Sequence, residues 1–192
     1  MYTRILVPVD GSVASARGLA EAIELARHLK ARIRLVHVVE PWVMVSPETP
    51  ATLHQVAENI RSAGAGLLEE CEKKVTNAGI QVDAELIETF GDSAGECIVE
   101  KAKEVDADLI VCGTHGRRGI RRMLMGSDAE YIVRRAPTPC CSYATRKRPI
   151  RRHDSCMAPR RQSRRLVHFV NCKTGVAGTG YWGLRSRLVL LR

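Results

Sequence analysis

Residues 107–130 read Ala-Asp-Leu-Ile-Val-Cys-Gly-Thr-His-Gly-Arg-Arg-Gly-Ile-Arg-Arg-Met-Leu-Met-Gly-Ser-Asp-Ala-Glu. An apolar run over 107–112 leads directly into a loop rich in glycine and arginine, and Ser127 then starts a helical pattern. A short run that is apolar on both faces is typical of a strand buried in a parallel sheet. This stretch therefore predicts a central strand, a loop at its carboxyl end and a helix.

The same alternation of strand and helix extends over the first 140 or so residues. Apolar runs predict strands over 4–9, 32–39, 81–88 and 107–112, with at best a short fifth strand over 140–145. Helical spacing predicts helices after Ser12, over about 52–77, after Ser93 and over 127–135. Strands that alternate with helices imply parallel βαβ units. We therefore expect an α/β fold, an open and doubly wound parallel sheet of five strands, in a single domain over residues 1–144.

Charge separates this domain from the rest of the chain. The 192 residues carry a net charge of +9, but residues 1–144 hold 17 Lys and Arg against 20 Asp and Glu, a net charge of −3. Residues 145–192 hold 13 Lys and Arg against Asp154 alone, a net charge of +12. Strand and helix periodicity also fades there, so we predict a basic and poorly ordered C-terminal extension over 145–192.

Three interpretations of this extension stay open. It is a basic arm that binds nucleic acid or an acidic partner, a solvated extension without a partner, or the product of a shifted reading frame. The abrupt loss of periodicity after Pro139 favours the third interpretation.

Composition argues against several functional classes. The seven cysteines form no Cys-x-x-Cys pair, which disfavours a zinc or redox site, and reduced thiols suit a cytosolic protein. Aromatic residues make up only 4% of the chain, fewer than a protein that stacks nucleic-acid bases usually has. No signal-peptide pattern and no apolar run of about 20 residues is present. We therefore expect a cytoplasmic protein without a membrane partner.

The loop after residue 112 has the chemistry of a polyphosphate cradle. Gly113, Gly116 and Gly126 allow backbone N–H groups to approach an anion, and Ser127 adds a hydroxyl donor at a helix N-terminus. Arginines such as Arg117 raise the local positive potential. The alternative is that the glycines only form turns and the arginines are solvated. The loop matches neither the Walker pattern nor the dinucleotide fingerprint.

The spacing Gly, two residues, Gly, nine residues, Gly-Ser resembles the ATP-binding signature of the universal stress protein family. The opening Ile5-Leu-Val-Pro-Val-Asp-Gly-Ser12 and the pair His37-Val38 are also similar to the family, in the right order over about residues 1–139. The resemblance implies an adenine nucleotide alpha hydrolase-like fold that binds ATP or AMP.

The resemblance also implies roles for single residues. The glycines of the loop and Ser127 hold phosphates and ribose, Val38 offers backbone hydrogen bonds to adenine, and Pro8 lines the pocket. His115 and Arg117 are expected as phosphate contacts. Asp10 lines the pocket and either helps to hold a magnesium ion carried by the nucleotide or only bonds its own turn.

The resemblance implies a stress-response regulator that is occupied by a nucleotide. It also implies a homodimer, because family members pair through the fifth strand. No general base, nucleophile or carboxylate pair stands out at the strand ends, so binding without rapid turnover is favoured over enzymatic activity. Two alternatives stay open: a slow ATPase or phosphotransferase, and a nucleic-acid-binding protein that acts through its basic tail.

Overall fold

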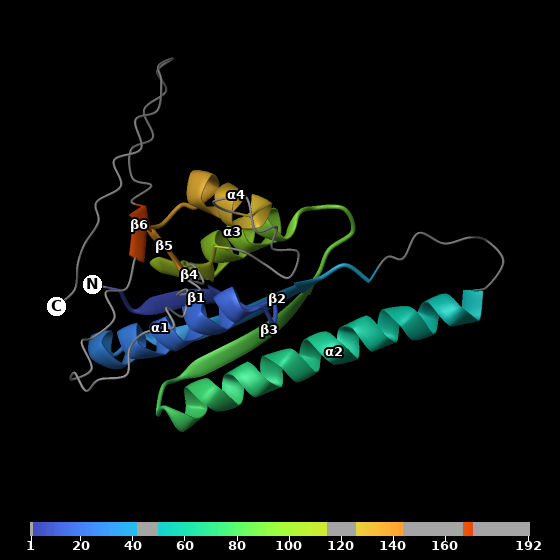
Figure 1. Ribbon diagram of the computed structural model, residues 1–192, viewed down its shortest axis with the longest axis horizontal. Helices are drawn as coiled ribbons and strands as arrows, with labels where there is room; N and C mark the ends of the chain where they lie inside the picture. Colours follow the sequence, from blue (N-terminus) through green and yellow to red (C-terminus); the bar gives the residue numbers. More distant parts are fainter. Residues whose placement is uncertain (1, 42–49, 115–125, 144–166, 171–192) are drawn as a thin grey trace, which may run out of the picture.

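The computed structural model describes residues 2–41, 50–114, 126–143 and 167–170 of the chain (Figure 1). Every strand and helix expected before residue 144 is present. The elements in chain order are β1 Arg4–Pro8, α1 Val13–Leu29, β2 Arg32–Val39, α2 Pro50–Asn77, β3 Val82–Glu88, α3 Ala94–Glu104, β4 Leu109–Gly113, α4 Ser127–Arg135, β5 Cys140–Tyr143 and β6 Val167–Val170.

The strands form one sheet in the order β3-β2-β1-β4-β5-β6, in which the first five are parallel. The chain moves outward from β1 to β2 and β3, then returns to place β4 on the other side of β1. The strand order therefore reverses between β1 and β4. In open sheets of this kind, the crevice at the carboxyl ends of the two strands that flank the reversal is where ligands bind.

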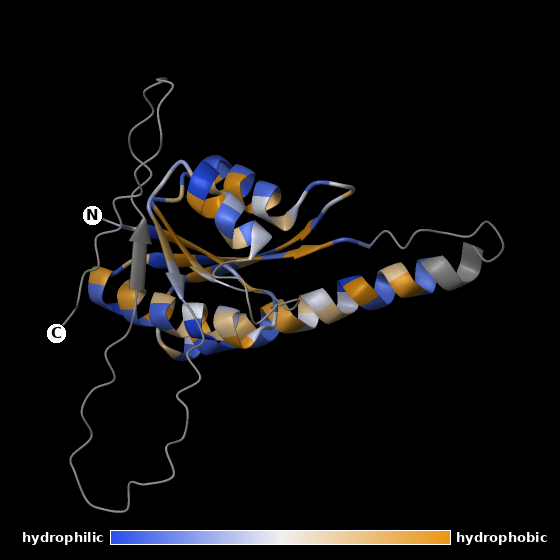
Figure 2. Cartoon of the chain, turned by 45° about the horizontal axis from the view of Figure 1, so that its top comes forward, coloured by the Kyte–Doolittle hydropathy of each residue, from blue (hydrophilic) through white to orange (hydrophobic). Residues whose placement is uncertain are grey.

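Helices cover both faces of the sheet. Figure 1 shows α1 and α2 on one face and α3 and α4 on the other, and each pair encloses its own apolar core. The central strands β1 and β4 are mainly hydrophobic, whereas β3 also carries acidic residues and the helices carry both polar and apolar residues (Figure 2). Ile5 and Val7 of β1 face the first core and Leu6 faces the second, as the two-residue alternation of a strand requires.

The outer edge beyond β4 differs from the expectation. β5 is short, as expected, and its four residues are all buried. β6 pairs antiparallel with β5, from Cys140↔Val170 to Tyr143↔Val167. This sixth strand was not predicted, because it lies inside the segment expected to be irregular. The rest of that segment, residues 145–166 and 171–192, lies outside the described residues.

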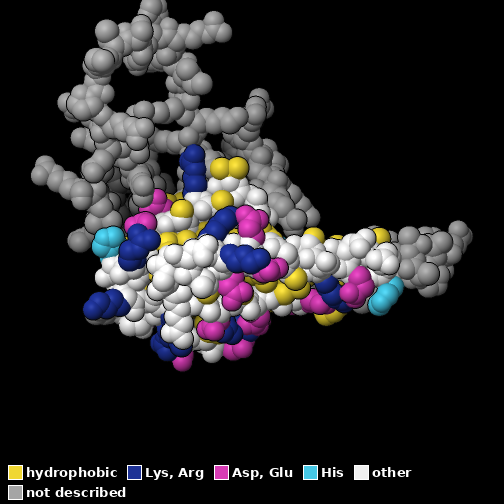
Figure 3. Space-filling view, turned by 90° about the horizontal axis from the view of Figure 1, so that it is seen from below, with side chains coloured by type: hydrophobic (Ala, Val, Ile, Leu, Met, Phe, Trp, Pro, Cys, Tyr) yellow, Lys and Arg dark blue, Asp and Glu magenta, His cyan; other side chains and the backbone are white. Residues whose placement is uncertain are grey.

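The surface of the described part mixes both signs of charge. Figure 3, which shows the side of α1 and α2, has basic and acidic side chains interspersed rather than gathered into one field. On the α3 face, Lys101 bonds Glu85 of β3 at 2.6 Å. Burial raises the pKa of Glu85, but hydrogen bonds from Lys101 and Arg34 outweigh it and hold that pKa below the ordinary carboxyl value. No helix within the described ranges is long and apolar enough to cross a membrane.

Candidate functional site

The candidate site lies at the carboxyl edge of the sheet, around the ends of β1, β2 and β4. β1 and β4 are direct neighbours, with Ile5 opposite Leu109 and Leu6 opposite Ile110. Their chains leave the sheet at Pro8 and Gly113, on the two sides of the point where strand order reverses. Pro8 and Gly113 lie about 100 residues apart in the sequence, and the strand order of the sheet brings them together.

The turn after β1 is closed by its own residues. The Asp10 carboxylate accepts the Ser12 N–H at 2.8 Å, and the Ser12 hydroxyl accepts the Ser15 N–H at 3.1 Å, which caps α1. Ser15, which is buried, donates its hydroxyl to the Pro8 carbonyl at 3.4 Å and accepts the Asp10 N–H at 3.2 Å. Gly11 has φ +77°, a conformation that favours glycine. This is the turn role considered for Asp10, and it uses only one carboxylate oxygen.

Gly113 lies against the start of α1. A Cβ built on Gly113 would lie 2.8 Å from both the Ala14 carbonyl carbon and the Ser15 nitrogen. A second glycine faces it from the helix, because a Cβ on Gly18 would lie 3.3 Å from the Cys112 carbonyl carbon. Gly113 is therefore required for packing between β4 and α1, whatever it does for a ligand.

Thr114 joins the two ends of the glycine-rich loop. The Gly126 N–H donates to the Thr114 carbonyl oxygen at 2.8 Å, so the residues before and after 115–125 meet. Thr114 is itself held by β5, because its N–H donates to the Tyr143 carbonyl at 2.9 Å and its hydroxyl donates to the same oxygen at 3.2 Å. The loop therefore starts and ends at one fixed point above β4 and β5.

The N-terminus of α4 opens at that point. Gly126 is its N-cap and provides no side-chain cap bond, in contrast to Ser12 at α1. Ser127 is exposed in the first helical position. An uncapped first turn leaves backbone N–H donors and the positive end of the helix dipole for an anion. Asp128 in the same turn is directed elsewhere, since its carboxylate accepts the Gly95 N–H of α3 at 3.3 Å.

Val38 extends beyond the end of β1. Pairing between β1 and β2 ends at Pro8↔Val36, followed by the hydrogen bond from the Val9 N–H to the Val36 carbonyl at 2.9 Å. Residues two apart in a strand direct their backbone groups to the same side, so Val38 directs its N–H and C=O past the end of β1. Within the described ranges, no hydrogen bond joins Val38 to β1. Its backbone donor and acceptor are therefore directed to the candidate site.

His37 fixes the spacing of the two strand ends. Its side chain is buried, and Nδ1 lies 2.6 Å from the Val9 carbonyl oxygen. Because that oxygen can only accept, Nδ1 carries the proton. The bond links β2 to β1 immediately before the Asp10 turn. The sequence had marked His37 only as part of a family-like pair and had given it no role.

The structure brings together six of the nine residues named from the sequence. They lie at the strand ends or at the ends of the loop, and are Pro8, Asp10, Val38, Gly113, Gly126 and Ser127. His115, Gly116 and Arg117 lie outside the described residues. Sequence reasoning missed Thr114, Ser15 and the structural role of His37. The position of Thr114 directly after Gly113, at the end of an apolar run, was the one local signal available for it.

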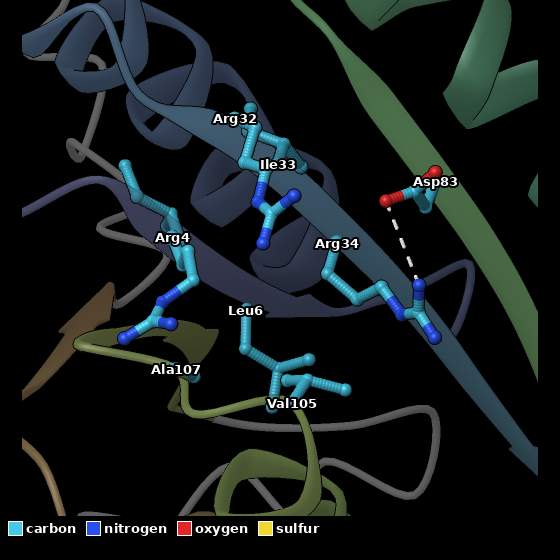
Figure 4. A pocket seen from close by; sticks show the side chains of 9 residues that line it. Arg4, Leu6, Arg32, Ile33, Arg34, Asp83, Val105 and Ala107 are labelled. Atoms are coloured by element: carbon cyan, nitrogen blue, oxygen red, sulfur yellow. Dashed lines mark ion pairs between the residues drawn. The ribbon is translucent and has the colours of Figure 1, made fainter.

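A small cavity of about 90 Å³ lies at the opposite edge of the sheet (Figure 4). Arg4, Arg32 and Arg34 line it at the amino ends of β1 and β2, and Arg34 is paired with Asp83 at 3.5 Å. Its position and size separate it from the candidate site. The described ranges contain no group of three or more His, Cys, Asp or Glu side chains arranged to hold a metal ion.

Comparison with known proteins gives one consistent result. The model of the universal stress protein family matches residues 1–141. A universal stress protein of Methanocaldococcus jannaschii is 32% identical over 139 residues, which cover 72% of this chain and 80% of that protein.

Solved structures similar to this chain are also universal stress proteins. Universal stress protein UspA from Lactobacillus plantarum has a TM-score of 0.65 at 25% identity, over 76% of this chain and 98% of that one. A universal stress protein from Archaeoglobus fulgidus, solved in complex with dAMP, has a TM-score of 0.51 at 26% identity, over 73% and 97% of the two chains.

Proposed function

This chain belongs to the universal stress protein family, and from that premise we propose that it binds an adenine nucleotide, ATP or AMP, at the carboxyl edge of β1, β2 and β4. Bound nucleotide is the signal by which it acts as a regulator in the response to stress. The proposal places the protein in the cytoplasm.

The contrast between two helix N-termini carries the proposal. Both α1 and α4 begin at the carboxyl edge of the sheet, but Ser12 caps α1 with its own hydroxyl. α4 begins at Gly126 without a side-chain cap, and Gly126 is bonded to Thr114 at the start of the same loop. Ser93 likewise caps α3. Among the helix N-termini whose caps the structure describes, α4 is therefore the one left open for phosphate groups, next to the point where strand order reverses.

The same geometry separates the parts of a nucleotide. The phosphates and ribose belong near Gly126 and Ser127, and the adenine belongs beside the backbone donor and acceptor of Val38. Half-buried Pro8 forms the floor between them. The second carboxylate oxygen of Asp10 suits a magnesium ion carried by the phosphates, because hard oxygen ligands suit this ion. The Archaeoglobus fulgidus relative with bound dAMP supports an adenine nucleotide as the ligand class.

The test is to denature the purified protein and separate the released small molecules by nucleotide chromatography, then to titrate the emptied protein with ATP and AMP. The test variant is Gly126→Val, because Gly126 has φ −73° and ψ 157°, which valine can adopt. We expect adenine nucleotide in the parent protein and at least tenfold weaker binding in the variant.

Gly66→Ala is the matched control, since nothing lies within 4 Å of a Cβ at that position in α2. We expect it to bind nucleotide as the parent does. A parent protein that neither carries nor takes up adenine nucleotide contradicts the proposal. Accumulation of ADP that is lost in Asp10→Ala, with ATP affinity kept, favours the slow ATPase instead.

The division into a nucleotide-binding domain over 1–144 and a basic extension over 145–192, of which β6 joins the sheet, is part of the same proposal. The homodimer implied by the family resemblance needs the outer edge of β5, which is where β6 lies.

A further inference from the structure

We propose that β6 occupies the place of β5 from a second copy of this chain, and that it thereby holds the protein as a monomer. Pairing at the outer edge of β5 does not depend on nucleotide binding. It makes the C-terminal segment a determinant of oligomeric state, and it revises the homodimer expected from the resemblance.

The direction of β6 is the first argument. All other neighbouring strands in the sheet are parallel, whereas β6 runs antiparallel to β5. A two-fold axis that sets an edge strand beside its own copy also makes the two strands antiparallel, because both copies present the same edge. The edge of β5 therefore accepts the strand direction that a symmetric dimer requires.

The buried state of β5 is the second argument. All four residues of β5 are buried even though the strand is short, and Cys140 and Cys141 have relative exposures of 1% and 0%. Apart from its shortness, β5 lacks the features that keep edge strands from pairing with other chains, such as charged side chains and proline. Without β6, this edge has unpaired backbone donors and acceptors and a strong tendency to pair.

Ser142 is the third argument. Its hydroxyl oxygen is buried and has no hydrogen-bond partner within the described ranges, so β6 leaves one polar group of the edge unsatisfied. A two-fold axis through Ser142 sets this residue directly opposite its own copy, with Cβ atoms about 4.5–5.5 Å apart. Two hydroxyls at that separation can bond each other. A second copy therefore satisfies a group that β6 does not.

Proximity explains why β6 is nevertheless found there. Residues 144–166 join β5 to β6, a connection of 23 residues. Because both strands belong to one chain, their pairing is intramolecular, and effective concentrations for such pairing are on the order of millimolar. A second copy at micromolar concentration has to pair roughly a thousandfold better than β6 to displace it. β6 therefore prevails over a better-fitting partner.

The experiment compares sedimentation velocity of the full chain and of a His168→Pro/Phe169→Pro variant over a range of concentrations. Adjacent prolines remove ladder donors from β6 whichever residue bonds β5. A Val176→Pro/Ala177→Pro chain, with the same change outside β6, is the matched control. We expect a monomer for the parent and control chains, and a concentration-dependent dimer for the β6 variant.

Ser142→Ala in the β6 variant distinguishes a specific dimer from aggregation, because it should weaken dimerisation by roughly two- to fivefold while leaving the monomer unchanged. If the double-proline chain precipitates, Phe169→Gly weakens β6 without removing a donor and repeats the test. A dimeric parent chain overturns the proposal. So does a folded β6 variant that stays monomeric at every concentration, or a dimer that is indifferent to Ser142→Ala.

Discussion

Replacing Gly113 by alanine tests whether the first glycine of the loop is a packing residue. The added Cβ would lie 2.8 Å from two backbone atoms of α1 and 3.0 Å from the Ala14 Cβ. Packed carbon atoms prefer separations of about 3.5–4.0 Å, so β4 or α1 has to move by about half an ångström or more. No side-chain rotation relieves the contact, because the nearest neighbours are main-chain atoms.

Overpacking of this kind costs about 1–3 kcal/mol of unfolding free energy. For a chain of this length, each kcal/mol lowers the melting temperature by about 2–4 °C, so Gly113→Ala should lower it by about 2–12 °C. Circular dichroism during heating measures this, and a urea titration with an unchanged m-value confirms that only stability has changed.

Gly126→Ala is the matched control at the other end of the loop. Its backbone conformation, φ −73° and ψ 157°, is open to alanine, and loss of a glycine N-cap costs no more than about 1 kcal/mol. We expect Gly126→Ala to weaken nucleotide binding with little loss of stability, and Gly113→Ala to lower both stability and nucleotide affinity. A Gly113→Ala protein that melts at or above the parent temperature would refute the packing argument.

Three further predictions concern the elements around the site. Gly66→Ala should stabilise α2 by up to about 1 kcal/mol. Gly64→Ala should be less stable than Gly66→Ala, because its Cβ meets side chains of β2 and β3 at 2.8–3.0 Å, and the midpoints of urea unfolding of the two variants test this order. His37→Ala leaves a buried carbonyl unpaired and should cost about 1–3 kcal/mol, with weaker nucleotide binding by titration. Because the folded pKa of Glu85 is lowered, its ion pair with Lys101 stabilises above the ordinary carboxyl pKa and is lost as pH falls through the folded value; Glu85→Gln should flatten the acid limb of a stability–pH curve.

The sequence predicted the strands and helices of the main domain because their signals are local. The apolar run ending at Cys112 and the helical pattern from Ser127 each depend on neighbouring residues only, and both elements are present. The family-like spacing of the loop also placed its ends correctly. Solved relatives with the same fold confirm the doubly wound architecture.

Other features depend on contacts between distant segments. β6 has only four residues within a basic stretch, and its strand conformation arises from pairing with the edge of β5. The tight contact between Gly113 and Ala14 appears only when β4 lies beside α1. Likewise, the open backbone of Val38 follows from β1 being shorter than β2, a difference that strand periodicity alone does not reveal.

The hydrogen bond between Gly126 and the Thr114 carbonyl has a consequence for how this family can diversify. The residues on either side of 115–125 meet at one hydrogen bond, and Thr114 is also bonded to the Tyr143 carbonyl of β5. Eleven positions can therefore change in sequence or number without moving β4 relative to α4. Ligand preference in such a chain can evolve by changes within residues 115–125, while selection acts separately on the fold that holds the two ends of this loop.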